Sequence, residues 1–163
     1  MAPLFVQIVA TLSARLFTSW REAARIGIAI MLLFTGISHF STLKHDLAAM
    51  IPPPFTGSLS LIYLTGVLEI AGAAGLLTRV LRTKAAWSLA GMMLALLPAN
   101  VYAALAGVTL GGQPATSLWI RGPLQVLWFA TLLWVARRGE STRIAGQLDV
   151  TRREWLVRRD GLM

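Results

Sequence analysis

The chain has 163 residues, enough for one domain, and 56% of them are hydrophobic, with a mean hydropathy of +0.66. Lys and Arg outnumber Asp and Glu by 15 to 7, which gives a net charge of +8. Because the basic residues lie between long apolar runs, we expect a lipid bilayer as the partner and no nucleic acid. Cys is absent, which excludes disulfides, thiolate zinc sites and iron–sulfur ligation within this chain.

The first expected element is an amphipathic helix over residues 1–23, lying in the membrane interface. Gln7, Thr11 and Arg15 fall on one stripe of this helix, opposite apolar residues at helical spacing, which are Phe5, Ile8, Val9, Leu12, Leu16 and Trp20. A cleaved signal peptide is the alternative, but no basic residue precedes the apolar stretch. We therefore expect the helix to be retained.

Four apolar runs then approach the roughly 20 residues that a helix needs to cross a bilayer. They are Ala24 to Phe40, Ser58 to Leu77, Ala85 to Leu105 and Trp119 to Val135, and Pro98 predicts a kink in the third. The predicted fold class is all-α, an integral membrane four-helix bundle over residues 24–136. Residues 137–163 form a predicted basic cytoplasmic tail resting on anionic lipid.

Orientation follows from the basic residues, which are retained on the cytoplasmic side. Thirteen of the 15 lie before the first span, between the second and third, or after the fourth, and the other two are Lys44 and Arg121. We expect both termini in the cytoplasm of a prokaryote and the protein in its inner membrane. The loops Ser41 to Gly57 and Ala106 to Leu118 then face outward.

Polar residues inside the spans mark the candidate site, because ionisable groups in a membrane usually face protein or a water-filled cavity. Glu69 lies near the middle of the second span, on a face that carries small residues, and should point into the bundle. Alternation of helix direction brings four more residues to the outer half of the membrane: His39, Asn100, Arg121 and Gln125. These five residues predict a polar pocket that opens outward.

Arg121 is the natural partner for Glu69, since opposite charges attract strongly in a low dielectric, although a bridging Asn100 or Gln125 is the alternative. Each residue also has a structural interpretation: an ion pair that fixes helix register, or an Asn100 that only bonds carbonyls freed by Pro98. Two histidines are too few for a haem or copper centre without other ligands, so we assign no metal.

Five segments combine small, polar and proline residues with apolar ones: Thr35 to Phe40, Met50 to Phe55, Tyr63 to Leu77, Leu96 to Leu105 and Arg121 to Trp134. Over roughly Arg25 to Trp134, they resemble the DoxX-like family of small four-helix membrane proteins. It implies a four-helix bundle. It also implies a link to quinol oxidation, thiosulfate-linked quinone reduction or membrane responses to oxidative stress.

Our leading interpretation is a small accessory subunit of a quinone-linked membrane redox complex, with a quinone headgroup or another small apolar ligand in the pocket. Arg121, Gln125 or His39 would donate hydrogen bonds to a carbonyl, and Glu69 would relay a proton. The alternative is a non-enzymatic scaffold or assembly subunit of a larger membrane complex or homo-oligomer. A small transporter is a third interpretation, and we recognise no self-contained catalytic site.

Overall fold

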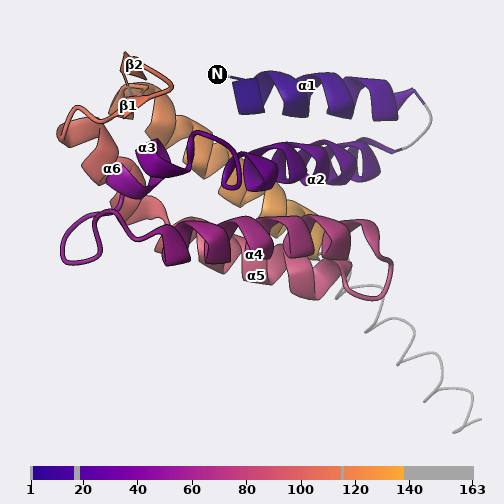
Figure 1. Cartoon of the computed structure of the whole chain (residues 1–163). Coiled ribbons are helices and arrows are strands. Elements are labelled where there is room, and N and C mark those ends of the chain that lie inside the picture. Colours follow the sequence, from indigo (N-terminus) through magenta and orange to yellow (C-terminus); the bar gives the residue numbers. More distant parts are fainter. Residues whose placement is uncertain (1, 17–18, 115, 138–163) are drawn as a thin grey trace, which may run out of the picture.

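The computed structural model describes residues 2–16, 19–114 and 116–137, and the predicted tail lies outside this part beyond Arg137. The described chain is mostly helical (Figure 1). Its helices are α1 (Ala2–Arg15), α2 (Trp20–Ser38), α3 (Lys44–Ala49), α4 (Leu59–Leu77), α5 (Arg82–Ala95), α6 (Leu97–Leu105) and a last helix, Leu118–Arg137. The two short strands β1 (Thr109–Leu110) and β2 (Gln113–Pro114) pair antiparallel.

Three helical segments are long and apolar enough to cross a membrane: Leu59–Leu77, Arg82–Leu105 and Leu118–Arg137. They correspond to the second, third and fourth predicted spans. The first prediction, Ala24 to Phe40, falls mostly on α2, which carries Arg21, Glu22 and Arg25 near its start. These charges leave too short an apolar stretch for α2 to qualify by length and composition.

Local sequence explains where these helices begin and break. Ser19 and Ser58 are the N-caps of α2 and α4, and each hydroxyl accepts a hydrogen bond from the backbone N–H three residues later. Pro98 stands in the first turn of α6, where its missing N–H costs little. The segment Arg82–Leu105 therefore divides at Leu96 into α5 and α6, as the predicted kink requires.

Large apolar side chains cover the outside of α4, while its small residues and Glu69 face the interior. On α4, Leu64 and Val67 are exposed, whereas Gly66, Glu69 and Ala73 are buried. A protein folded in water would reverse this arrangement, but it suits helices that face lipid and approach one another through small residues. The compact core contains Leu32, Leu76 and Leu89, from α2, α4 and α5, and Leu132 from the last helix.

The α1 helix forms an antiparallel hairpin with α2, with which it lies side by side in Figure 1. Its polar stripe faces protein: Thr11 contacts the helix at Gly27, and Gln7 is buried and accepts a hydrogen bond from Trp128 Nε1 at 2.7 Å. Phe5, Ile8 and Leu12 are exposed. Gln7 and Thr11 therefore pack against protein, because side chains of this size and polarity also make close helix contacts, and the interfacial placement of the helix stays a prediction.

Charged residues hold together the end of the bundle where α2 and α5 begin and α4 ends. Glu22 forms ion pairs with Arg25 and with Arg82, the latter at 3.2 Å, and Arg25 donates a hydrogen bond to Leu76 O at 2.5 Å. Leu76 lies in the last turn of α4, where carbonyls lack helical donors. Arg25 therefore connects α2 to α4.

Replacing Arg25 with methionine should lower the free energy of unfolding by about 1–3 kcal/mol, because the Leu76 carbonyl and the Glu22 carboxylate each lose a charged donor. SDS titration in mixed micelles measures this change. Arg79→Met is the matched control, since Arg79 is exposed in the nearby α4–α5 turn. Equal effects of the two variants would contradict the role of Arg25.

Candidate functional site

All five predicted site residues line one pocket of about 650 Å³. Leu47 of α3 and Leu110 of β1 line the pocket, and Figure 1 shows these two elements at the end of the bundle opposite the start of α2. Pro3 and Leu4 of α1 also line it, as do Met50 and Phe55 of the α2–α4 connection. Most of the lining is apolar, with polar groups at a few positions, which is typical of small-molecule sites.

Glu69 stands on the wall that α2 and α4 form. Its side chain is 7% exposed, and Oε2 accepts a hydrogen bond from the Thr35 hydroxyl at 2.7 Å. His39 Nδ1 lies 4.0 Å from the same carboxylate oxygen and 2.8 Å from Thr35 O. Thr35 and His39 are one helical turn apart on α2, so the two side chains reach Glu69 together.

The opposite wall belongs to α5, α6 and the last helix. Arg121 Nη1 donates to Asn100 Oδ1 at 3.3 Å, and Asn100 Nδ2 donates to Gln125 Oε1 at 2.7 Å. Gln125 Nε2 then donates to Met93 O at 2.6 Å. Met93 lies in the last turn of α5, so the break at Leu96 makes this carbonyl accessible.

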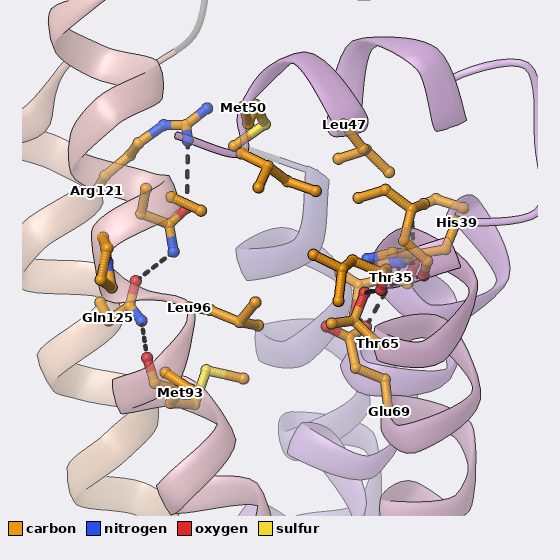
Figure 2. Close-up of a pocket in the computed structure, with 18 of the residues that line it drawn as sticks. Thr35, His39, Leu47, Met50, Thr65, Glu69, Met93, Leu96, Arg121 and Gln125 are labelled. Atoms are coloured by element: carbon orange, nitrogen blue, oxygen red, sulfur yellow. Dashed lines mark hydrogen bonds and ion pairs between the residues drawn. The ribbon is translucent and has the colours of Figure 1, made fainter. Parts of the chain in front are cut away.

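Figure 2 shows the two polar clusters facing each other across the pocket, with Glu69, Thr35 and His39 on one side and Arg121 and Gln125 on the other. The ion pairs among the described residues do not include one between Glu69 and Arg121. The predicted direct pair is therefore wrong. Each charged group instead takes a neutral polar partner on its own wall, because the pocket lies between them.

The prediction for Asn100 also needs correction, because Gln125, not Asn100, bonds the carbonyl near the helix break. Thr35, Gln7 and the Met93 carbonyl were not predicted as parts of this region. The position of Thr35, one turn before His39 in an apolar helix, is a signal that could have found it. In the described part of the chain, no group of three or more His, Asp or Glu could hold a metal ion.

Two loops meet over the same end of the bundle. Asp46 of α3 accepts a hydrogen bond from the backbone N–H of Gly111 at 2.7 Å. Gly111 has φ of 61°, a conformation that favours glycine, so the β1–β2 turn presents its N–H to α3. The hydrogen bond between Asp46 and Gly111 therefore holds α3 beside the hairpin, next to the pocket.

A family model described as a domain of unknown function, DUF8561, matches residues 28–136, about two thirds of the chain. The chain belongs to the DUF8561 family. All five site residues and both pocket walls lie within the DUF8561 region, whereas α1 lies before it. No curated protein and no solved structure matches the chain significantly.

The DUF8561 match corrects the resemblance to the DoxX-like proteins, since no model of that family matches the chain. The segments behind that resemblance combine glycines, a proline and single polar residues within apolar helices. Such combinations recur among membrane helices because close packing, helix breaks and polar sites require them. The expected redox association therefore loses the support that came from the resemblance.

Proposed function

We propose that this DUF8561 protein binds a small, largely apolar molecule in the membrane, in the pocket between Glu69 and Arg121. The observation that carries the proposal is the polar cluster on each of two facing walls, with an apolar lining between them. An apolar lining favours an apolar ligand body, and separated polar groups fix its orientation. A quinone headgroup remains one ligand of suitable size, and the role of accessory subunit in a redox complex now depends on the pocket alone.

The proposed membrane arrangement has four long spans, α2, α4, the α5–α6 segment and the last helix, and the shorter α1 runs back through the membrane along α2. The cluster of Glu22, Arg25 and Arg82 would mark the cytoplasmic boundary, and α3 and the hairpin would lie outside. Pro3 and Leu4 line the pocket, so the start of α1 lies near the outer end of this bundle. The proposal therefore places Arg15, not the start of α1, at the cytoplasmic side.

Cysteine labelling can test this orientation without background, because the chain has no Cys. Thr56 and Lys84 are exposed in the connections before α4 and at the start of α5. In intact cells, a membrane-impermeant maleimide should label Thr56→Cys, and it should reach Lys84→Cys only after permeabilisation. The reverse pattern would contradict the proposed orientation.

The ligand itself should be sought by native mass spectrometry of protein gently extracted from its own membrane, with extraction of small molecules from the same sample. Glu69→Gln and Arg121→Ala should each lower the bound ligand severalfold, because each removes a polar group from one wall. Arg79→Ala, an exposed change far from the pocket, is the matched control. Unchanged ligand content in both pocket variants would reject the proposal.

A scaffold or assembly role is the second candidate, and the exposed apolar faces of α4 and the last helix are the observation in its favour. However, the small residues Gly66 and Ala73, which would suit lateral association, are buried within the chain. The same purification separates the two functions. A large co-purifying membrane complex without a small ligand would favour the scaffold.

A further inference from the structure

The hydrogen bonds on the Arg121 wall can run in only one direction. At one end, Met93 O is a carbonyl and can only accept, so the Gln125 amide must turn its NH₂ group toward it. At the other end, the Arg121 guanidinium can only donate, so Asn100 must turn its Oδ1 toward it. Asn100 then donates to Gln125. The hydrogen-bond partners therefore assign the O and N atoms of both side-chain amides, which their shape alone does not.

With this direction of the hydrogen bonds, the Arg121 wall keeps N–H donors that bond no described residue. A guanidinium has five N–H groups, and only one bonds a described residue here. Asn100 and Gln125 each use one N–H and also use their carbonyl oxygens. A ligand that reaches this wall therefore meets N–H groups.

The Glu69 wall presents hydrogen-bond acceptors, in contrast to the donors of the Arg121 wall. His39 Nδ1 is 2.8 Å from Thr35 O, which can only accept, so Nδ1 carries a hydrogen, and in a neutral ring Nε2 is then an acceptor. The Thr65 and Ser38 hydroxyls donate to the backbone carbonyls of Ile62 and Thr35, at 2.9 and 2.6 Å. Their oxygens remain as acceptors.

Glu69 adds an acceptor in either charge state. Its Oε2 is engaged by Thr35, and no described residue donates to Oε1. The carboxyl group lines the pocket, and every fully buried side-chain polar atom of the described residues has a partner, so Oε1 is open to the pocket. An ionised Glu69 accepts at Oε1, and so does a carboxylic acid that donates its proton from Oε2 to Thr35 Oγ1, with the Thr35 hydroxyl then donating to Met31 O.

From this polarity, and on the basis of the proposed binding function, we infer that the ligand has a hydrogen-bond donor at one end and an acceptor at the other. Its hydroxyl or N–H group lies at Glu69 and His39, and its carbonyl or ether oxygen lies at Arg121. A ligand that only accepts, such as an oxidised quinone, satisfies the Arg121 wall alone. With a neutral His39 ring, this assignment replaces the expected hydrogen bond from His39 to a ligand carbonyl by one that His39 accepts.

Three probes of nearly equal size test this assignment. 4-Hydroxybenzophenone has one donor and one carbonyl acceptor, 4-methoxybenzophenone lacks the donor, and 4-benzylphenol lacks the carbonyl. Binding to the full chain in nanodiscs is measured by equilibrium dialysis, with empty nanodiscs to correct for partition into lipid. We expect 4-hydroxybenzophenone to bind about tenfold more tightly than either of the other two, since each loses one hydrogen bond.

Variants then assign each end of the probe to a wall. In Glu69→Gln the amide oxygen accepts from Thr35 and its NH₂ group faces the pocket, so the preference for hydroxyl over methoxy should disappear. The preference for the carbonyl should persist there, which shows that the variant is folded. Arg121→Met should give the converse result, losing the carbonyl preference and keeping the hydroxyl preference.

The outcomes separate the two proposals. Equal binding of the three probes to the original chain, with weaker binding of all three to the pocket variants, would overturn the polarity and leave the pocket function standing. If the original chain bound none of the probes, both proposals would fail for this class of ligand. A hydroxyl preference that Glu69→Gln retains would also overturn the assignment of the donor end.

Discussion

Gly66→Ala should lower the free energy of unfolding by about 1–3 kcal/mol, although alanine is the better helix former. A Cβ at Gly66 would lie 2.7 Å from His39 Cβ, 3.0 Å from Phe40 Cε2 and 3.1 Å from Gly36 O. Two of these atoms belong to or adjoin the α2 backbone, so no side-chain rotation relieves the overlap. The α2 and α4 helices must separate, and SDS titration measures the cost.

Gly91→Ala is the matched control, because nothing lies within 4 Å of a Cβ at Gly91 of α5. The same change of residue there should leave stability unchanged or raise it by up to about 1 kcal/mol, through helix propensity alone. The difference between the two variants isolates the α2–α4 contact. If Gly66→Ala behaved like Gly91→Ala, the close approach of α2 and α4 would be wrong.

The Gly66 variant also tests how the site is built. Gly36 of α2 and Gly66 of α4 let the two helices approach closely, and His39 and Glu69 each lie one turn beyond these glycines. Separation of the helices should therefore weaken the contact between His39 and Glu69 as well. Loss of stability and loss of ligand would then arise from one change in packing.

The sequence was sufficient to predict most of the helices because their signals are local. Apolar runs identified α4, the α5–α6 segment and the last helix to within three residues, and Ser58 and Pro98 mark an N-cap and a helix break. The interior position of Glu69 followed from the small residues on its helical face. The two strands were missed, since β1 and β2 have two residues each and form within a loop.

Alternating helix direction also brought the five polar residues to one end of the bundle, but it could not predict their partners. Charge alone favoured a bond between Glu69 and Arg121. The structure places the pocket between them. Glu69 is hydrogen-bonded to Thr35 instead, and Arg121 to Asn100. The width of a pocket depends on helix tilt and on side chains from all its walls, which residue spacing does not specify.

For α1 the sequence predicted an amphipathic helix, and its placement in the membrane interface stays a prediction. An amphipathic pattern shows that two faces of a helix meet different surroundings, but it does not say which surroundings. In water the polar face is outside. In lipid, an exposed apolar face with the buried Gln7 and the partly buried Thr11 against protein forms the same pattern with the opposite orientation.

Gly27→Leu should detach α1 from α2, and this prediction decides between the two placements of α1. A Cβ at Gly27 would lie 1.9 Å from Thr11 Oγ1 and 2.9 Å from Gln7 O, so the α1 backbone must move. Gln7 would then lose its hydrogen bond from Trp128, and Pro3 and Leu4 would leave the pocket lining. In nanodiscs, hydrogen–deuterium exchange should rise at least about tenfold across α1 and remain unchanged in the middle of α4.

Gly91→Leu makes the same replacement where no neighbour lies within 4 Å, so it should leave exchange in α1 unchanged. A helix lying separately in the interface would not respond to either variant, since neither glycine would touch it. That result would restore the interfacial placement. Faster exchange across α1 with Gly27→Leu alone would establish the hairpin, and weaker ligand binding in the same variant would show that α1 completes the pocket.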